Sequence, residues 1–116
     1  MSQQDFPYTE EALIVRFAER HCRDIRYSPD HKCFFIYEGK RWIRDDTMII
    51  FNRAGDMLME LRVYCNRETN MSGWRWKAMN DATNKFMTVR TTQNMVRGVK
   101  ALITISADEL DELNEA

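Results

Sequence analysis

Residues 24–46 read DIRYSPDHKCFFIYEGKRWIRDD, and this stretch decides the fold. Ser28-Pro29-Asp30 and Glu38-Gly39-Lys40 are turn signals, and the glycine of the second can adopt the positive φ that a tight hairpin demands. The segments between the turns are rich in aromatic and β-branched residues, which favour strands. We therefore predict an antiparallel meander of three short strands. Its large packing groups are expected to be Phe35, Tyr37 and Trp42.

Helical periodicity flanks the meander on both sides. Before it, Thr9 precedes two glutamates, which is typical of a helix start, and apolar residues recur at helical spacing to about Cys22. After it, Asp45-Asp46-Thr47 supplies a second helix cap. The apolar positions behind this cap are Ile50, Ala54, Met57, Leu58, Leu61 and Cys65. The sequence thus predicts an α+β fold, mainly helical, in which an N-terminal helix and the small three-stranded antiparallel meander precede a helical bundle over residues 46–102.

The second half of this bundle is expected to consist of short helices. Trp74–Met79 and Ala82–Thr88 show helical spacing on either side of Asn80-Asp81, which we expect to separate them. Thr91 or Thr92 is expected to cap a further helix. The apolar positions of that helix are Met95, Val96, Val99 and Leu102.

The C-terminal residues carry two further signals. Residues 102–106 alternate like a short strand, and Ser106-Ala107-Asp108-Glu109 has the spacing of a capping box, which predicts about one helical turn at the tail. We expect three parts in the chain: an arm over residues 1–8, a single domain over residues 9–111 and an acidic tail over residues 112–116.

Charge is distributed unevenly along the chain. The 116 residues include 17 Lys and Arg and 18 Asp and Glu, so the formal net charge of −1 argues against a polycationic affinity for nucleic acid. Residues 62–107, however, contain 8 basic and 2 acidic residues, whereas residues 108–116 contain 5 acidic residues and no basic one. This asymmetry indicates an interaction surface, with an ordinary solvated helix face as the alternative.

Targeting and redox signals are also informative. The sequence contains no signal-peptide pattern and no apolar stretch of the ~20 residues that span a bilayer. We therefore expect a soluble, cytoplasmic protein with no membrane partner. Cys22, Cys33 and Cys65 are an odd number of cysteines without a secretory signal, which favours free thiols over a disulfide framework.

Motifs of catalysis are missing from the sequence. There is no Gly-rich phosphate-binding loop, and His21 lies on the apolar stripe of the first helix, where we expect it to pack rather than act as a base. His21-Cys22 with His31 and Cys33 have metal-ligand side chains, but their spacing differs from that of the paired ligands of zinc sites. Asp45-Asp46 is better explained as a helix start than as a cation site. We expect no enzyme activity, no catalytic residue, no cofactor and no bound metal.

Aromatic and basic residues alternate in Trp74-Arg75-Trp76-Lys77, a combination that lets bases stack on rings while cations meet phosphates. The predicted nucleic-acid-binding residues are Trp74, Arg75, Trp76, Lys77, Lys85, Arg90, Arg97 and Lys100. The alternative is structural. One tryptophan would pack and the other would partly cover it, because adjacent residues of a helix cannot both face inward.

An ordered series of motifs extends over most of the chain, from about residue 9 to residue 111. The series comprises Asp24-Ile25-Arg26-Tyr27-Ser28-Pro29, residues 34–42, Asp45-Asp46, Lys85-Phe86, residues 90–99 and residues 105–111. It resembles the amino-terminal domain of phage, plasmid and poxvirus primase-helicases, the domain that precedes the superfamily 3 helicase. The positions that match the family motifs are Tyr27, Pro29, Phe35, Tyr37, Gly39, Trp42, Leu110 and Asp111. Phe34 stands where the family usually has tryptophan.

The resemblance implies a non-catalytic accessory and linking module in the DNA replication of a mobile element. In that family the phosphate loop, the magnesium carboxylates and the primase residues lie on other domains. The expected partners are a helicase, a primase or another replication protein, with single-stranded DNA at the basic stretch. The alternative is a free-standing phage or mobile-element protein that binds and inhibits a host replication or defence complex, such as a CRISPR effector, as a decoy. Neither hypothesis fixes the oligomeric state.

Overall fold

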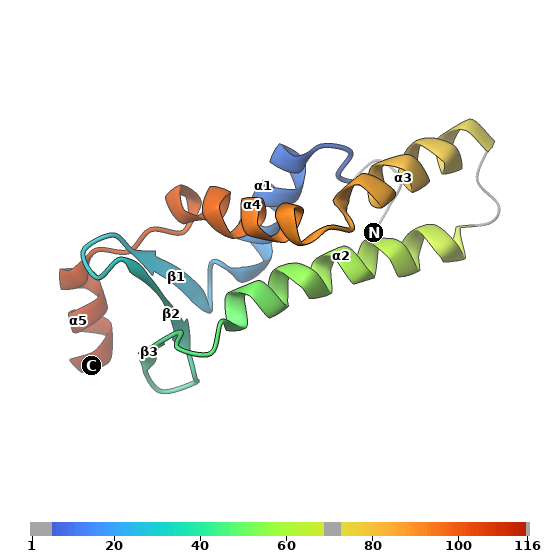
Figure 1. The fold of residues 1–116 in the computed structure, drawn as a ribbon. Coiled ribbons are helices and arrows are strands. Elements are labelled where there is room, and N and C mark those ends of the chain that lie inside the picture. Colours follow the sequence, from blue (N-terminus) through green and yellow to red (C-terminus); the bar gives the residue numbers. More distant parts are fainter. Residues whose placement is uncertain (1–5, 69–72, 116) are drawn as a thin grey trace.

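A three-stranded sheet lies between an N-terminal helix and a series of later helices (Figure 1). The computed structural model describes residues 6–68 and 73–115. Over these residues the helices are α1 (Glu10–His21), α2 (Ile49–Arg67), α3 (Gly73–Phe86), α4 (Val89–Val99) and α5 (Ala107–Glu115), with a 3-10 turn, η2 (Lys100–Leu102), after α4. The strands are β1 (Ile25–Ser28), β2 (Cys33–Tyr37) and β3 (Trp42–Arg44). The predicted α+β, mainly helical class is confirmed, as is the antiparallel meander.

Helix α1 begins where the sequence predicts. The Thr9 hydroxyl accepts a hydrogen bond from the Ala12 amide at 3.1 Å, and Glu10 and Glu11 lie in the positive first turn. The buried residues of this helix recur at the predicted helical spacing; they are Leu13, Phe17, Ala18 and His21.

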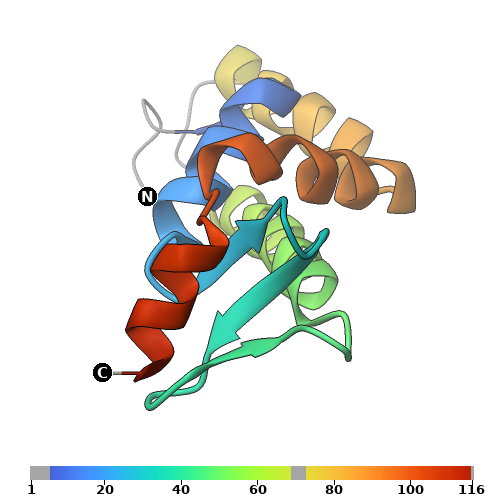
Figure 2. The same cartoon turned by 90° about the vertical axis from the view of Figure 1, so that its left-hand side faces the viewer.

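The two faces of the sheet are covered by different helices. Ile25 and Phe34 lie on one face, where they join a large hydrophobic cluster with residues of α1 to α4, here called the main cluster. Phe35 points to the opposite face, where it packs with Ile105 and with Leu110 of α5; these three buried residues are here called the α5 cluster. Figure 2 shows α5 running alongside the strands at this end of the molecule.

Of the three expected packing groups of the meander, Tyr37 is the exception. Phe35 is buried and Trp42 is half-buried against the α5 cluster, but Tyr37 is 42% exposed. It stands at the end of β2, directly before the turn in which Gly39 adopts a φ of +102°. Its hydroxyl donates to the Gly39 carbonyl at 2.9 Å, so the residue closes the hairpin rather than filling the core.

Helix α2 carries a long buried face, and all six of its predicted apolar positions are buried. The predicted start is too early, because Met48 takes a left-handed conformation (φ 58°) and the helix begins at Ile49. Asp45 still satisfies the first free amides from outside the helix. Its two carboxylate oxygens accept from the amides of Ile49 at 2.8 Å and Ile50 at 3.0 Å.

The predicted break at Asn80-Asp81 is wrong, since α3 is one continuous helix. Both side chains are engaged away from the helix backbone. Arg62 of α2 donates from Nη1 to Asn80 Oδ1 at 2.9 Å, and Lys77 Nζ lies 3.3 Å from Asp81 Oδ2. These two side chains therefore do not compete for the amides of the helix, which is how Asn and Asp usually interrupt one.

Helix α4 is capped by Thr88, not by Thr91 or Thr92 as predicted. The Thr88 hydroxyl accepts from the Thr91 amide at 3.1 Å, and Thr91 itself is buried in the first turn. Each of the three threonines carries a capping hydroxyl. Thr88 takes the role because its backbone is extended (φ −138°, ψ 153°), as a cap residue requires.

The expected strand over residues 102–106 is reduced to a single bridge. The chain first makes η2 and then pairs Thr104 with Tyr27 of β1 in parallel. The Tyr27 amide donates to the Ile103 carbonyl, and the Ile105 amide donates to the Tyr27 carbonyl, both at 2.8 Å. This bridge occupies the outer edge of β1.

Helix α5 starts as predicted and runs further than expected. The Ser106 hydroxyl accepts from the Glu109 amide at 3.1 Å, as in a capping box, and Asp30 accepts from the Ala107 amide at 3.0 Å. The helix then continues to Glu115 instead of ending after about one turn. Residues 112–115 of the expected tail are therefore helical.

The molecule is long, with principal extents of 54 × 24 × 21 Å. The pair of helices α2 and α3 extends away from the sheet, and α5 lies at the opposite end (Figure 1). Of the expected N-terminal arm, residues 1–5 lie outside the described residues, whereas Phe6 is buried and stacks on Tyr64 of α2 at 6.2 Å between ring centroids. Within the described residues, no helix combines the length and apolarity needed to cross a membrane.

Candidate nucleic-acid interface

The N-terminal end of α3 presents an exposed indole beside a guanidinium. Trp74 is 70% exposed, and the Arg75 Cζ lies 5.2 Å from the centroid of its ring. A cation at this distance is attracted to the electrons of the ring face. The remaining exposed surface of the Trp74 ring is large, flat and apolar, which suits stacking against an unpaired base.

Trp76 and Lys77 are engaged with the protein. The Trp76 indole donates from Nε1 to the Cys65 carbonyl of α2 at 3.0 Å, so this ring covers the helix pair. Lys77 pairs with Asp81, and both side chains are more than half exposed, so the pair is weak and screened by salt. Burial raises the pKa of the Cys65 thiol, which keeps it protonated and unreactive. Of the two predicted tryptophans, Trp74 is thus the one available for stacking.

Three predicted cations lie exposed on α3 and α4. Lys85 is near the C-terminal end of α3, where a positive charge is favoured by the helix dipole. Arg90 and Arg97 are seven positions apart on α4 and therefore share one side of that helix. Met95 and Val99 form the opposite, buried side. The two arginines are thus directed away from the main cluster.

Lys100 lies apart from these cations. It is half-buried, and its Nζ lies 4.9 Å from the centroid of the Tyr27 ring on β1. This contact directs its charge toward the sheet. Of these four predicted DNA-binding cations, Lys100 thus contacts the sheet, and the other three are exposed on α3 and α4.

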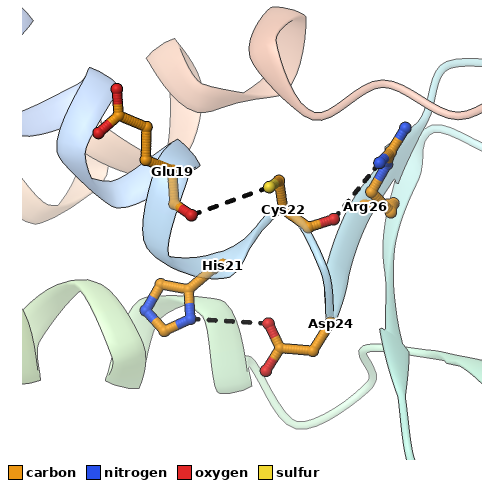
Figure 3. A network of polar contacts seen from close by, with 5 residues as sticks. All are labelled: Glu19, His21, Cys22, Asp24 and Arg26. Atoms are coloured by element: carbon orange, nitrogen blue, oxygen red, sulfur yellow. Dashed lines mark hydrogen bonds and ion pairs between the residues drawn. The ribbon is translucent and has the colours of Figure 1, made fainter.

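A polar network links α1 and β1 at the turn between them (Figure 3). The Cys22 thiol donates to the Glu19 carbonyl at 3.8 Å, and Arg26 Nη1 donates to the Cys22 carbonyl at 3.3 Å. His21 Nδ1 lies 3.8 Å from Asp24 Oδ1. Burial lowers the pKa of His21, and the Asp24 carboxylate opposes that change only in part.

The second histidine, His31, has a different structural role from His21. His31 Nδ1 shares a hydrogen bond of 2.8 Å with the hydroxyl of Ser28, which is fully buried and also accepts from the His31 amide. This arrangement fixes the turn between β1 and β2. Across residues 6–68 and 73–115, no three His, Cys, Asp or Glu side chains gather as metal ligands would.

An apolar groove that the sequence did not predict lies between α2 and the junction of α3 with α4. Its volume is ≈ 450 Å³, and Gly55 leaves its α2 side open. Met59 and Met87 line it together with Val89, which is 75% exposed. A signal was present in the sequence, because Val89 stands outside the helical stripe of Thr91, Met95 and Val99.

No protein-family model, curated protein or solved structure matches this chain.

Proposed function

We propose that this chain is a non-catalytic accessory module of a phage or mobile-element replication machinery, a partner of helicase or primase, that contacts single-stranded DNA through α3 and α4. Two independent observations support this function. The motif series resembles the amino-terminal domain of primase-helicases, and Lys85, Arg90 and Arg97 of the basic segment are exposed on α3 and α4. The observation that carries the DNA contact is the 70% exposure of Trp74 next to Arg75.

The geometry favours a single strand over a duplex. An exposed indole can stack only on a base whose face is free, and the bases of a duplex are covered by their neighbours. Lys85, Arg90 and Arg97 would meet the phosphates along the same two helices, and the release of counterions from the strand would supply much of the affinity.

Fluorescence anisotropy of a short labelled oligothymidine tests the proposal directly. Trp74→Ala is expected to weaken binding by about 5- to 100-fold, the value of one lost base stack. Arg90→Glu with Arg97→Glu is expected to weaken binding and to flatten its dependence on salt concentration. Arg23→Glu reverses one exposed charge just after α1; it is the control for each single reversal on α4 and should leave both quantities nearly unchanged.

Two outcomes would contradict the DNA contact. The first is an absence of binding at low salt. The second is an equal loss of affinity in the Arg23→Glu control and in the α4 variants, because that result would indicate unspecific attraction by net charge alone.

The apolar groove favours a second candidate, a free-standing protein that occupies the docking surface of a host replication or defence complex as a decoy. Methionine side chains adapt to varied partners, and exposed Met59, Met87 and Val89 offer such a surface. A photo-crosslinking residue at position 89 is expected to capture a nucleic-acid-handling partner. The same residue at position 15, where Val15 is 48% exposed on α1, should not. Capture from both positions would argue against the groove.

A further inference from the structure

Strand β3 forms one edge of the sheet. The Arg41 carbonyl accepts from the Glu38 amide, and the Asp45 amide donates to the Phe34 carbonyl, both at 2.9 Å. Residues 41 and 45 therefore direct their backbone groups toward β2. Because these directions alternate along an antiparallel strand, Trp42 and Arg44 direct theirs outward, to the edge.

A side-chain amide occupies this edge. The Trp42 amide donates to Asn114 Oδ1 at 2.8 Å, and Asn114 Nδ2 donates to the Trp42 carbonyl at 3.1 Å. One amide thus meets both backbone groups of Trp42, as the peptide group of a neighbouring strand would. The edge is therefore competent to pair with another strand, and Asn114 is the group that closes it.

Asn114 lies in the last turn of α5, where the helix is expected to be least stable. The helix has nine residues, and Glu112 and Glu115 lie in that same turn. Negative charge is unfavourable at the C-terminal end of a helix dipole, and a helix of this length is marginal without its packing contacts. If this turn frays, Asn114 is released, whereas Leu110, one turn earlier, is held by its packing in the α5 cluster.

The sequence around β3 is complementary to itself. Residues 40–46 read KRWIRDD. When two copies are placed antiparallel with Ile43 facing Ile43, each Trp42 lies opposite Arg44, which is a favourable aromatic–cation pair. The flanking positions place Lys40 opposite Asp46 and Arg41 opposite Asp45. The Asp45 carboxylate already accepts from the amides of Ile49 and Ile50, so the Lys40–Asp46 and Trp42–Arg44 contacts are the ones that favour this register.

We propose that two copies of this chain pair through their β3 edges about a two-fold axis at Ile43, with Asn114 as the competing intramolecular partner. The register agrees with the backbone. Trp42 and Arg44 point outward, so each Trp42–Arg44 pair can exchange two N–H···O bonds, while Ile43 forms the pair without hydrogen bonds. The Arg44 carbonyl already accepts from the Asp46 amide at 3.1 Å and would accept the second bond through its other lone pair. The Ile43 side chain is 43% exposed and gains cover in the pair. This inference is independent of the DNA-binding function proposed above.

The dimer is expected to be weak in the unaltered chain. Strand β3 has three residues, so the contact area is far below the ~1,200–2,000 Å² of a stable interface, and pairing must displace Asn114. Asn114→Ala removes the competitor and is expected to tighten dimerisation by at least about tenfold, since it frees two hydrogen-bonding groups. Sedimentation equilibrium of the full chain measures this change, and circular dichroism checks that α5 is retained.

A charge exchange tests the register and is made in the Asn114→Ala chain, where dimerisation is expected to be tight enough to measure. Lys40→Glu and Asp46→Lys each place like charges opposite one another and should weaken dimerisation. An equimolar mixture of these two variants, or the double variant, restores an opposite charge at each Lys40–Asp46 contact and should recover it. Ile43→Lys, at an exposed position, should abolish it. A monomeric Asn114→Ala chain with α5 intact, or a failure of the mixture to recover dimer, would overturn the proposal.

Discussion

The main cluster and the α5 cluster cover opposite faces of the same sheet but are built very differently. The main cluster joins buried side chains from α1, α2, α3 and α4 to Ile25 and Phe34 of the sheet. The α5 cluster consists of Phe35, Ile105 and Leu110, with Cys33 and Trp42 half-buried around it. Local stability follows the amount of apolar surface that an element buries. The main cluster should therefore set the global stability, whereas α5 should open on its own.

Truncation in the main cluster is expected to have the largest effect. Phe17 is fully buried in α1, and Phe17→Ala should lower the free energy of unfolding by about 3–5 kcal/mol, through lost transfer energy and the cavity left behind. Urea denaturation followed by circular dichroism measures this loss. Val15→Ala, at a 48% exposed position of the same helix, is the control and should change stability by less than about 0.5 kcal/mol. Equal losses in both variants would show that α1 does not anchor the core.

Truncation in the α5 cluster should have a smaller and local effect. Leu110 is the buried residue of α5, so Leu110→Ala removes about 2–3 kcal/mol of packing from this helix. If α5 opens without the rest, as we expect, amide hydrogen exchange should speed up in α5 and at Trp42, while α2 keeps its protection. Leu113→Ala, on the 51% exposed side of the same helix, is the control. A loss of protection in α2 equal to that in α5 would mean that the two clusters unfold as one.

The sequence predicted the features that depend on local spacing and missed those that depend on contacts between distant residues. The buried face of α2 and the Thr9 cap follow from local spacing, and both are confirmed. The predicted break at Asn80-Asp81 is wrong because Arg62, on another helix, engages Asn80. Such long-range partners leave no periodic signal in the sequence.

At the candidate site, too, contacts between distant residues could not be predicted from the sequence. The pattern Trp74-Arg75-Trp76-Lys77 predicts an aromatic and basic surface, but which indole is exposed depends on the Cys65 carbonyl that Trp76 reaches across the helix pair. The contact of Lys100 with the Tyr27 ring and the bonds of Asn114 to Trp42 likewise join residues that only the tertiary fold brings together. Sequence composition can therefore propose such a surface, but packing decides its members.

The pH dependence of stability tests the main cluster through His21, which packs against it. Its effect on the free energy of unfolding should be the smallest of the three. His21 is buried against Phe17, at 4.8 Å between ring centroids, and burial lowers its pKa below the ordinary value of 6.5. The unfolded chain therefore binds this proton more readily than the folded chain does. The contribution of His21 to the free energy of unfolding is fully present above about pH 6.5 and is lost as the pH falls from there through the lowered pKa. This loss should be smaller than the loss caused by either truncation above.

Two variants isolate the contribution of His21 by urea denaturation at a series of pH values. His21→Gln should remove this part of the pH dependence, because no imidazole is left to titrate. Asp24→Asn should enlarge it, because the carboxylate 3.8 Å from Nδ1 favours the protonated ring and its loss lowers the pKa of His21 further. The loss at low pH should spread to α1 and the main cluster while the α5 cluster keeps its own exchange rates. A pH profile shared by His21→Gln and the unaltered chain would instead place the titration on other groups, and the protonation of His21 would then contribute nothing to the pH dependence of stability.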